Sequence, residues 1–212
     1  MKSALVMLSG GSDSATALFQ TAKNFKTTAV FFDYGQVSAD FELTSARQLC
    51  RVAGVPLEVV DISGIKRFFL GVAAEPIVPL GFIGGSRANC PHGLFGVASS
   101  YCISAGIDVL VTGMQLDDTK GLTDVKGYLS TWAQAMRKLQ PTSFDFHFPL
   151  IDMAKTDVLK LGGQLNVPFD LTRSCSESTH YHCGQCPACI ERKTAFKAAG
   201  ITDPTKYLAE ES

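Results

Sequence analysis

A short polar run near the N-terminus has the residue types of a phosphate-binding loop. Glycines let backbone N–H groups approach a ligand closely because no Cβ intervenes, and serine hydroxyls add further donors. No lysine follows in the loop, so the GxxxxGK[ST] pattern of ordinary P-loop ATPases is absent. The alternative is a plain turn after a strand, in which Asp13 or Ser14 caps the next helix. The run reads Ser9-Gly10-Gly11-Ser12-Asp13-Ser14.

A second group of reactive side chains lies near the C-terminus, where two overlapping CxxC steps follow a cysteine eight residues earlier. Four thiolates complete the tetrahedral shell of Zn²⁺ and leave no open position, as in structural zinc sites. The alternatives are a ligand from His180 or His182, a redox CxxC pair, and an iron–sulfur cluster. A redox pair would need neither the first nor the last of these cysteines. The cluster consists of Cys175, Cys183, Cys186 and Cys189.

Apolar runs that alternate with helix-like patterns must position both groups. The predicted strands are residues 4–8, 26–35, 56–62, 108–113 and 144–150, and the predicted helices are residues 15–22, 39–54, 94–105, 128–139 and 156–165, the last capped by Thr156 or Asp152. This alternation implies right-handed βαβ units, and hence an α/β fold with a Rossmann-like, doubly wound parallel sheet. Ligands bind at the carboxyl ends of the strands in such sheets. We therefore expect the polar run, the turn Asp33-Tyr34-Gly35 and Gly113 to share one rim.

Length and composition bound the fold and exclude some classes of function. The chain has 212 residues, of which 46% are hydrophobic and 18% charged, with a formal net charge of -1. This favours one large domain at residues 1–170 and a smaller segment at residues 171–212. No Lys/Arg cluster is longer than a pair, so we expect no nucleic-acid partner. We see no membrane span or secretory signal and expect a cytoplasmic protein. The other cysteines are expected to be buried small hydrophobes: Cys50, Cys90 and Cys102.

The polar run resembles the SGGxDS loop of the PP-loop superfamily of N-type ATP pyrophosphatases. Together with the cysteine cluster, it makes the chain similar to the 7-cyano-7-deazaguanine synthase family, the ATP-dependent nitrile-forming enzymes of the queuosine precursor pathway. The resemblance spans most of the chain. Besides the run itself, it rests on Asp33-Tyr34-Gly35-Gln36 with Glu42-Leu43, Pro149-Leu150 with Lys155, Ser174-Cys175, and Cys183-Gly184-Gln185-Cys186-Pro187-Ala188-Cys189 with Arg192 and Phe196.

The resemblance implies a PP-loop α/β domain with a C-terminal zinc-binding helical segment, and in many members a homodimer. It also implies the small-molecule substrates 7-carboxy-7-deazaguanine and ammonia, with ATP as co-substrate, Mg²⁺, and structural Zn²⁺. In such enzymes the carboxylate attacks the α-phosphate of ATP, and ammonia then displaces AMP to give an amide. A second activation dehydrates the amide to the nitrile.

The same resemblance implies roles for individual residues. As catalytic candidates it gives Asp13, which holds Mg²⁺ or caps a helix; Lys155, a cation near the phosphates or a solvated lysine; and Arg192. For ATP binding it gives Leu8, Ser9, Gly10, Gly11, Ser12, Asp13, Ser14, Ala15, Thr16, Asp33, Tyr34 and Gly113. For the deazaguanine substrate it gives Gln36, Arg87, Asn89 and Asp124, and for zinc the four clustered cysteines.

The middle of the chain departs from the family pattern. Ser38 stands where the family usually has histidine, and residues 85–89 separate the Arg and Asn of a Pro-Gly-Arg-Asn-like stretch. Residues 121–126 lack the Pro and Cys of a Gly-Tyr-Pro-Asp-Cys-Arg-like segment. A related PP-loop ligase acting on another carboxylate, or joining a deazaguanine to another acceptor, therefore remains an alternative. So does a nucleotide-binding or zinc-stabilised interaction protein without enzymatic activity.

Overall fold

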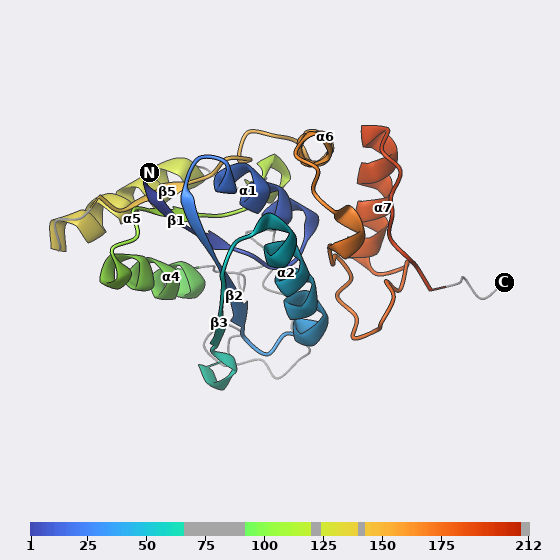
Figure 1. Cartoon of the computed structure of the whole chain (residues 1–212), viewed down its shortest axis with the longest axis horizontal. Helices are drawn as coiled ribbons and strands as arrows, with labels where there is room; N and C mark the ends of the chain where they lie inside the picture. Colours follow the sequence, from blue (N-terminus) through green and yellow to red (C-terminus); the bar gives the residue numbers. More distant parts are fainter. Residues whose placement is uncertain (66–91, 120–123, 140–142, 209–212) are drawn as a thin grey trace.

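Five parallel strands form one sheet, in the order β3-β2-β1-β4-β5, in a computed structural model of the chain (Figure 1). The described residues are 1–65, 92–119, 124–139 and 143–208. From β1 the chain builds outward first to β2 and β3 and later to β4 and β5, so the order reverses between β1 and β4. Such a switch point is where open α/β sheets bind ligands. The strands are β1 (Ser3–Met7), β2 (Lys26–Asp33), β3 (Leu57–Asp61), β4 (Val109–Val111) and β5 (Asp145–His147).

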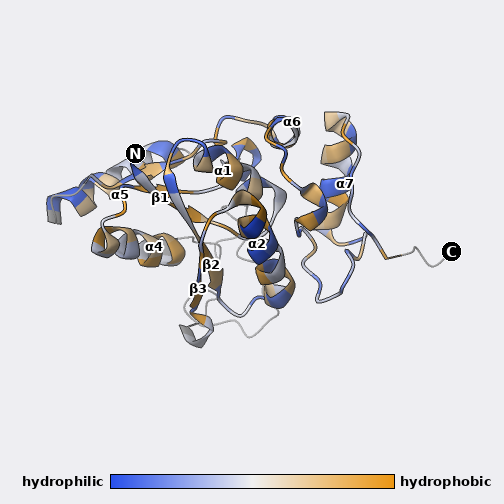
Figure 2. Ribbon diagram, in the orientation of Figure 1, coloured by the Kyte–Doolittle hydropathy of each residue, from blue (hydrophilic) through white to orange (hydrophobic). Residues whose placement is uncertain are grey.

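Helices cover both faces of the sheet, which confirms the predicted doubly wound α/β fold. One apolar core lies between the sheet and α1, α2, α6 and α7, and a second lies between the opposite face and α4 and α5 (Figure 1). Figure 2 shows α4 mostly in the hydrophobic and neutral colours, whereas α2 also carries hydrophilic stretches. The helices are α1 (Ser12–Ala22), α2 (Ala39–Ala53), α4 (His92–Ala105), α5 (Val125–Leu139), α6 (Lys155–Gln164) and α7 (Pro187–Ala199).

The central strand β1 is buried on both sides. Ala4, Val6 and Leu8 belong to the first core, whereas Leu5 and Met7 belong to the second. Side chains alternate across a strand, so a strand covered on both faces needs an almost continuous apolar run. This is why the sequence before the polar run contains no alternating polar positions.

Several element boundaries differ from the sequence-based expectations: among them, α1 begins at Ser12 rather than residue 15, and β4 is Val109–Val111 rather than residues 108–113. The last strand, predicted over residues 144–150, is only Asp145–His147, because β4 offers just three residues to pair with it. Helix α5 begins at Val125, three residues before its predicted start. Helix α6 begins at Lys155 with Ala154 as N-cap and no side-chain cap bond, so neither Thr156 nor Asp152 caps it.

The C-terminal segment packs onto the sheet domain. Ala195 and Phe196 of α7 complete the first core, and the Phe196 ring meets Phe169 edge-on at a centroid distance of 5.2 Å. Cys50 and Cys102 are buried in the cores as predicted, whereas Cys90 lies outside the described residues. Within those residues, no helix has both the length and the apolar character that a membrane span requires.

Candidate functional site

Residues 9–14 form a loop between β1 and α1 that its own serines hold in shape. Ser14 Oγ accepts the Ser9 N–H at 3.2 Å, lies 3.0 Å from Ser9 Oγ, and donates to the Gly11 carbonyl at 3.2 Å. The first backbone bond of α1 runs from the Ala15 N–H to the Gly11 carbonyl at 3.0 Å. The N–H groups of the three preceding helical residues therefore have no acceptor within the helix. Together with the positive end of the helix dipole, they can bind an anion.

Neither Asp13 nor Ser14 caps α1, so the loop is not the plain capped turn that the sequence left open. The N-cap is Gly11 in an extended conformation, without a side-chain cap bond. Ser14 turns back onto the loop, and the Asp13 carboxylate reaches Lys155 instead. The helix N-terminus is therefore left for a ligand.

Gly10 is required by the shape of this loop. Its φ is +84°, in the left-handed region that favours glycine, and an added Cβ would lie 2.7 Å from the Glu42 carbonyl oxygen. The loop is thus packed directly against the first turn of α2.

Replacing Gly113 by alanine should weaken anion binding at the loop and lower stability. A Cβ at this position would lie 2.7 Å from the backbone N and Cα of Ser14 and 2.9 Å from the Asp13 carbonyl carbon. The first turn of α1 would have to shift, and overpacking of this kind costs about 1–3 kcal/mol. Urea unfolding measures the loss of stability, and calorimetric titration with pyrophosphate measures anion binding. The control is Gly96→Ala, whose Cβ would approach nothing closer than 3.9 Å; equal behaviour of the two variants would contradict the prediction.

A cavity of about 290 Å³ opens in front of the loop. Its walls come from the ends of β1 and β2, the first turn of α1, the start of α6 and the C-terminal segment. Segments from both ends of the chain therefore meet at the carboxyl edge of the sheet, as the topology predicts. The charged side chains that line the cavity are Asp13, Glu42, Asp118, Lys155, Arg173, Glu191 and Arg192.

Lys155, the first residue of α6, brings its ammonium group into this cavity. Its Nζ lies 2.5 Å from Asp13 Oδ2, and the two side chains are 18% and 22% exposed. Burial by itself would lower the pKa of Lys155, but the charge and hydrogen bond of Asp13, with Glu191 and Asp118 nearby, raise it above its ordinary value. The amine is therefore protonated at neutral pH. This position is not that of a solvated surface lysine.

Asp118 is a cavity residue that the sequence-based assignment missed. It lies in the short 3₁₀ turn Leu116–Thr119 that follows β4, and its Oδ2 accepts the Gln115 N–H at 2.9 Å. Burial, and to a smaller extent repulsion by Asp13, raise the pKa of this carboxyl to about 6. Its position just beyond the carboxyl end of β4, beside the switch point, was the available signal.

Replacing Asp118 by asparagine should stabilise the fold at pH 7 and change little below about pH 4. The folded-state pKa lies near 6, above the ordinary value of 3.8. The folded state therefore binds the proton more tightly than the unfolded state, and this carboxyl lowers stability as the pH rises from about 4 to 6. A two-unit shift corresponds to at most about 3 kcal/mol. Urea unfolding at both pH values tests this. Glu58→Gln, on the exposed side of β3, is the control. A D118N protein that is no more stable than the wild type at pH 7 would contradict the prediction.

Arg192 lies at the cavity wall, but its guanidinium is occupied by the protein. Its side chain is 2% exposed and stacks over the Phe196 ring at 4.7 Å. Each nitrogen already donates to an oxygen, so the geometry favours a structural role over that of a cation available to a ligand. The acceptors are Thr172 Oγ1 at 2.8 Å, Ser174 Oγ at 3.2 Å, the Phe169 carbonyl at 2.9 Å and Asp203 Oδ1 at 3.2 Å.

The turn after β2 brings Tyr34 and Gln36 to the cavity, as the sequence suggested. Asp33 Oδ1 accepts the Gly35 N–H at 2.8 Å, and Gln36 Oε1 accepts the Tyr34 N–H at 3.0 Å. Gln36 Nε2 also donates to Glu42 Oε2 at 3.0 Å. Burial raises the pKa of Tyr34, so its hydroxyl remains protonated. Asp33 therefore shapes the turn, while Tyr34 and Gln36 form part of the cavity wall.

Of the other predicted substrate residues, Asp124 is not brought to this cavity. Asp124 is exposed, and its Oδ1 accepts the Gly127 N–H at 2.7 Å, at the start of α5. Arg87 and Asn89 lie outside the described residues. Ser38, which replaces the usual histidine of the family pattern, is buried and donates to Glu42 Oε1 at 2.5 Å.

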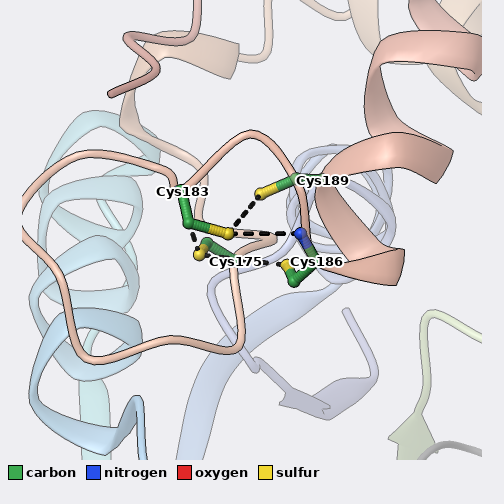
Figure 3. A group of neighbouring side chains, drawn as sticks. All are labelled: Cys175, Cys183, Cys186 and Cys189. Carbon is green, nitrogen blue, oxygen red and sulfur yellow. Dashed lines mark hydrogen bonds between the residues drawn. The ribbon is translucent and has the colours of Figure 1, made fainter. Parts of the chain in front are cut away.

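The four predicted cysteine ligands converge on one point (Figure 3). All four Sγ atoms lie within 4.8 Å of one another. Cys183 and Cys189 are 3.9 Å apart, and Cys175 and Cys186 are 4.0 Å apart. Four sulfurs around one ion at about 2.3 Å are separated by about 3.8 Å, so the spacing suits a tetrahedral metal. The cluster can therefore hold a metal ion.

Neither nearby histidine belongs to this cluster. His182 is buried and its Nε2 accepts the Ser174 N–H at 3.0 Å, while its backbone pairs with Lys206 and Leu208. His180 instead meets the Tyr181 ring at a centroid distance of 4.8 Å. The group of ligand atoms found among the described residues consists of cysteine sulfurs alone.

Comparison with proteins of known structure supports the fold. The U34-tRNA thiolase NcsA from Methanococcus maripaludis, solved with its [4Fe-4S] cluster, aligns with a TM-score of 0.55 and 20% identity, covering 94% of this chain and 67% of that protein. The NMN synthetase from Francisella tularensis aligns with a TM-score of 0.50 and 16% identity, covering 100% of this chain and 90% of that enzyme. At these identities the likeness concerns the fold.

Comparison with sequences identifies the family. The family model described as queuosine biosynthesis protein QueC matches residues 3–74 and 90–200. The 7-cyano-7-deazaguanine synthase of Caldicellulosiruptor bescii is 32% identical, with 98% of each chain covered. That of Methanobrevibacter smithii is 27% identical, over 97% of this chain and 98% of the relative. The cavity at the SGGxDS loop and the cysteine cluster thus lie in a chain that belongs to the QueC family of queuosine biosynthesis proteins.

Proposed function

We propose that this protein is an ATP-dependent 7-cyano-7-deazaguanine synthase, which converts 7-carboxy-7-deazaguanine and ammonia to the nitrile. The observation that carries the proposal is one cavity that combines the unpaired N–H groups at the start of α1 with the partly buried ammonium of Lys155. Both suit the phosphates of ATP, in a chain whose relatives are named for this reaction. As further parts of the proposal, the enzyme works in the cytoplasm as a homodimer and without nucleic acid.

The chemistry requires charge neutralisation, because a carboxylate must attack the α-phosphate of an anion. The loop N–H groups and Lys155 would bind the phosphate oxygens and stabilise the negative charge that develops there. Mg²⁺ commonly binds one or two carboxylates together with substrate phosphates. Asp13, Asp118 and Glu191 are cavity carboxylates near Lys155, and we assign this role to Asp13 and Asp118.

The proposed reaction consumes ATP twice. Attack by the carboxylate forms a bond to the α-phosphorus and releases pyrophosphate. Ammonia then forms a C–N bond, AMP leaves, and one proton is lost, which gives the amide. The amide oxygen is adenylated in turn with loss of a second pyrophosphate, and departure of AMP together with the two remaining N–H protons leaves the carbon–nitrogen triple bond. Two AMP are therefore expected for each nitrile.

For the cysteine cluster we propose structural Zn²⁺. Four sulfurs within 4.8 Å of one another suit four bonds to a single ion. In a [4Fe-4S] cluster each cysteine binds a different iron, so the thiolates are spread farther apart. The thiolase NcsA was solved with a [4Fe-4S] cluster, so an iron–sulfur cluster is the alternative that must be excluded. Elemental analysis and the visible absorption spectrum of the purified protein distinguish the two metals.

The test of the proposed function is a substrate-panel assay that counts AMP by chromatography and identifies the product by mass spectrometry. The proposal expects AMP formation with 7-carboxy-7-deazaguanine plus ammonium, a nitrile product, and two AMP for each product molecule. A second candidate is a ligase for another carboxylate, favoured by the exposed position of Asp124 and by Ser38 in place of the family histidine. AMP formation only with a different acid would support that candidate and overturn the first.

A further inference from the structure

Arg173 joins the two sites that the sequence treats as separate. It lies two residues before the ligand Cys175, and its side chain is buried at 6% exposure. Its backbone N–H donates to the Gly10 carbonyl at 2.8 Å, inside the anion-binding loop. Its carbonyl oxygen lies 3.5 Å from where a Cβ on Gly11 would be. The main chain at Arg173 therefore packs directly against both loop glycines.

The guanidinium of Arg173 faces the other way, into the loop of residues 175–182 that connects the first two cysteine ligands. Nε donates to the Cys175 carbonyl at 3.3 Å, Nη2 to the Glu177 carbonyl at 2.5 Å and Nη1 to the His180 carbonyl at 3.5 Å. The planar fork thus holds the middle of this loop, while Cys175 and Cys183 fix its ends at the metal cluster.

A third contact joins Arg173 to α2. The guanidinium carbon lies 4.7 Å from the centre of the Phe41 ring. The next residue, Glu42, has the carbonyl oxygen against which Gly10 packs. Arg173 therefore contacts both the cysteine loop and the first turn of α2, and the latter borders Gly10.

We propose that Arg173 is a positioning residue that couples the four-cysteine site to the anion-binding loop, so that metal binding and triphosphate binding strengthen each other. An ordered cysteine loop holds the guanidinium, and the backbone of Arg173 then holds Gly10 in place. Coupling between two sites is reciprocal, so the triphosphate must stabilise the metal site by the same factor. The second half of this inference rests on the proposed ATP binding.

The alternative is that Arg173 lends its charge directly to the phosphates, since it also lines the cavity. The two roles make different demands on the side chain. Lysine keeps the charge but lacks the planar fork that binds several carbonyls at once. Arg173→Lys should therefore be as harmful as Arg173→Met if the residue positions the loop, but much less harmful if only its charge matters.

The experiment compares the zinc-loaded wild type, R173K and R173M, with Arg47→Lys on the exposed face of α2 as the matched control. Three quantities are measured: hydrogen exchange of residues 8–16, the Kd of a non-hydrolysable ATP analogue, and the rate of zinc transfer to a chromophoric chelator with and without that analogue. Circular dichroism confirms that each variant is folded. The wild type stripped of zinc provides an arm that needs no substitution.

We expect zinc removal to speed exchange in the loop of the wild type, and both Arg173 variants to show fast exchange with zinc still bound. Both should bind the analogue about tenfold more weakly, and the analogue should slow zinc release about tenfold in the wild type and R47K only. Loop exchange that is insensitive to zinc would overturn the proposal, as would wild-type affinity in R173K. Zinc-dependent exchange in a wild type that binds no analogue would refute the proposed function and the reciprocal half, but would support the role of Arg173 in positioning the loop.

Discussion

Replacing Lys155 by methionine is expected to lower the rate of ATP cleavage to AMP by about 100- to 1,000-fold, the usual loss when a preorganised group that stabilises developing charge is removed. Its ammonium lies 2.5 Å from Asp13, in the cavity that is lined by the N-terminal turn of α1. Methionine has a similar length and no charge, so packing at the start of α6 should be preserved. The measurement is the initial rate of AMP release under saturating substrates, with circular dichroism to confirm folding.

The matched control is Lys160→Met, on the same helix. Lys160 is 52% exposed and lies 3.6 Å from Asp157, outside the cavity. It should keep wild-type activity, since an exposed ion pair of this kind contributes little. A K155M enzyme that makes AMP at the wild-type rate would remove Lys155 from the reaction. Binding of the ATP analogue by K155M, measured separately, shows how much of the loss lies in the chemical step.

Replacing Cys186 by serine is expected to release the metal and to lower the free energy of unfolding by at least about 3 kcal/mol, because structural zinc contributes its binding energy directly to folding. For a chain of this length that loss corresponds to a fall in Tm of about 10 °C. The cluster holds together the loop of residues 175–182 and the start of α7, where buried apolar side chains are few: the local core is Cys175, Cys186 and Cys189. Elemental analysis and thermal unfolding give the two readouts.

Cys50→Ser controls for the loss of a buried sulfur. Cys50 is 3% exposed in the first core, so serine there places a hydroxyl among apolar side chains and should also lower Tm. Metal content should nevertheless remain at the wild-type value. A C186S protein that keeps its full metal content would contradict the four-cysteine assignment, whatever its stability.

The local features of the fold were readable from the sequence. The apolar run before Ser9 predicted β1 because a strand buried on both faces has no polar positions, and Gly54 correctly marked the end of α2, where its φ is +65°. The boundary of α6 was not readable in the same way. Its N-cap, Ala154, makes no side-chain bond, so the capping preferences used on the sequence had nothing to detect.

The residues of the cavity were likewise only partly predictable from the sequence. Asp118 and Asp124 occupy one polar stretch of the sequence, and family resemblance selected Asp124. The structure turns Asp118 into the cavity and leaves Asp124 exposed at the start of α5. The resemblance made Arg192 a catalytic candidate and gave Arg173 no role, because the number of donors that a guanidinium has left for a ligand depends on acceptors contributed by distant segments.

The sequence by itself determined the features that depend on residues close together in the chain. These are the glycine-serine loop, the set of cysteines that can reach one ion, and the alternation of strands and helices that makes a parallel sheet. These depend on local backbone geometry and on side-chain periodicity. Only the tertiary structure decided that Lys155 and Asp118 enter the cavity, that Arg192 is occupied, and that Arg173 joins the cysteine cluster to Gly10. Those outcomes depend on long-range packing, which brings the start of α6 and the C-terminal segment against the first turn of α1 and is not encoded in any single stretch of residues.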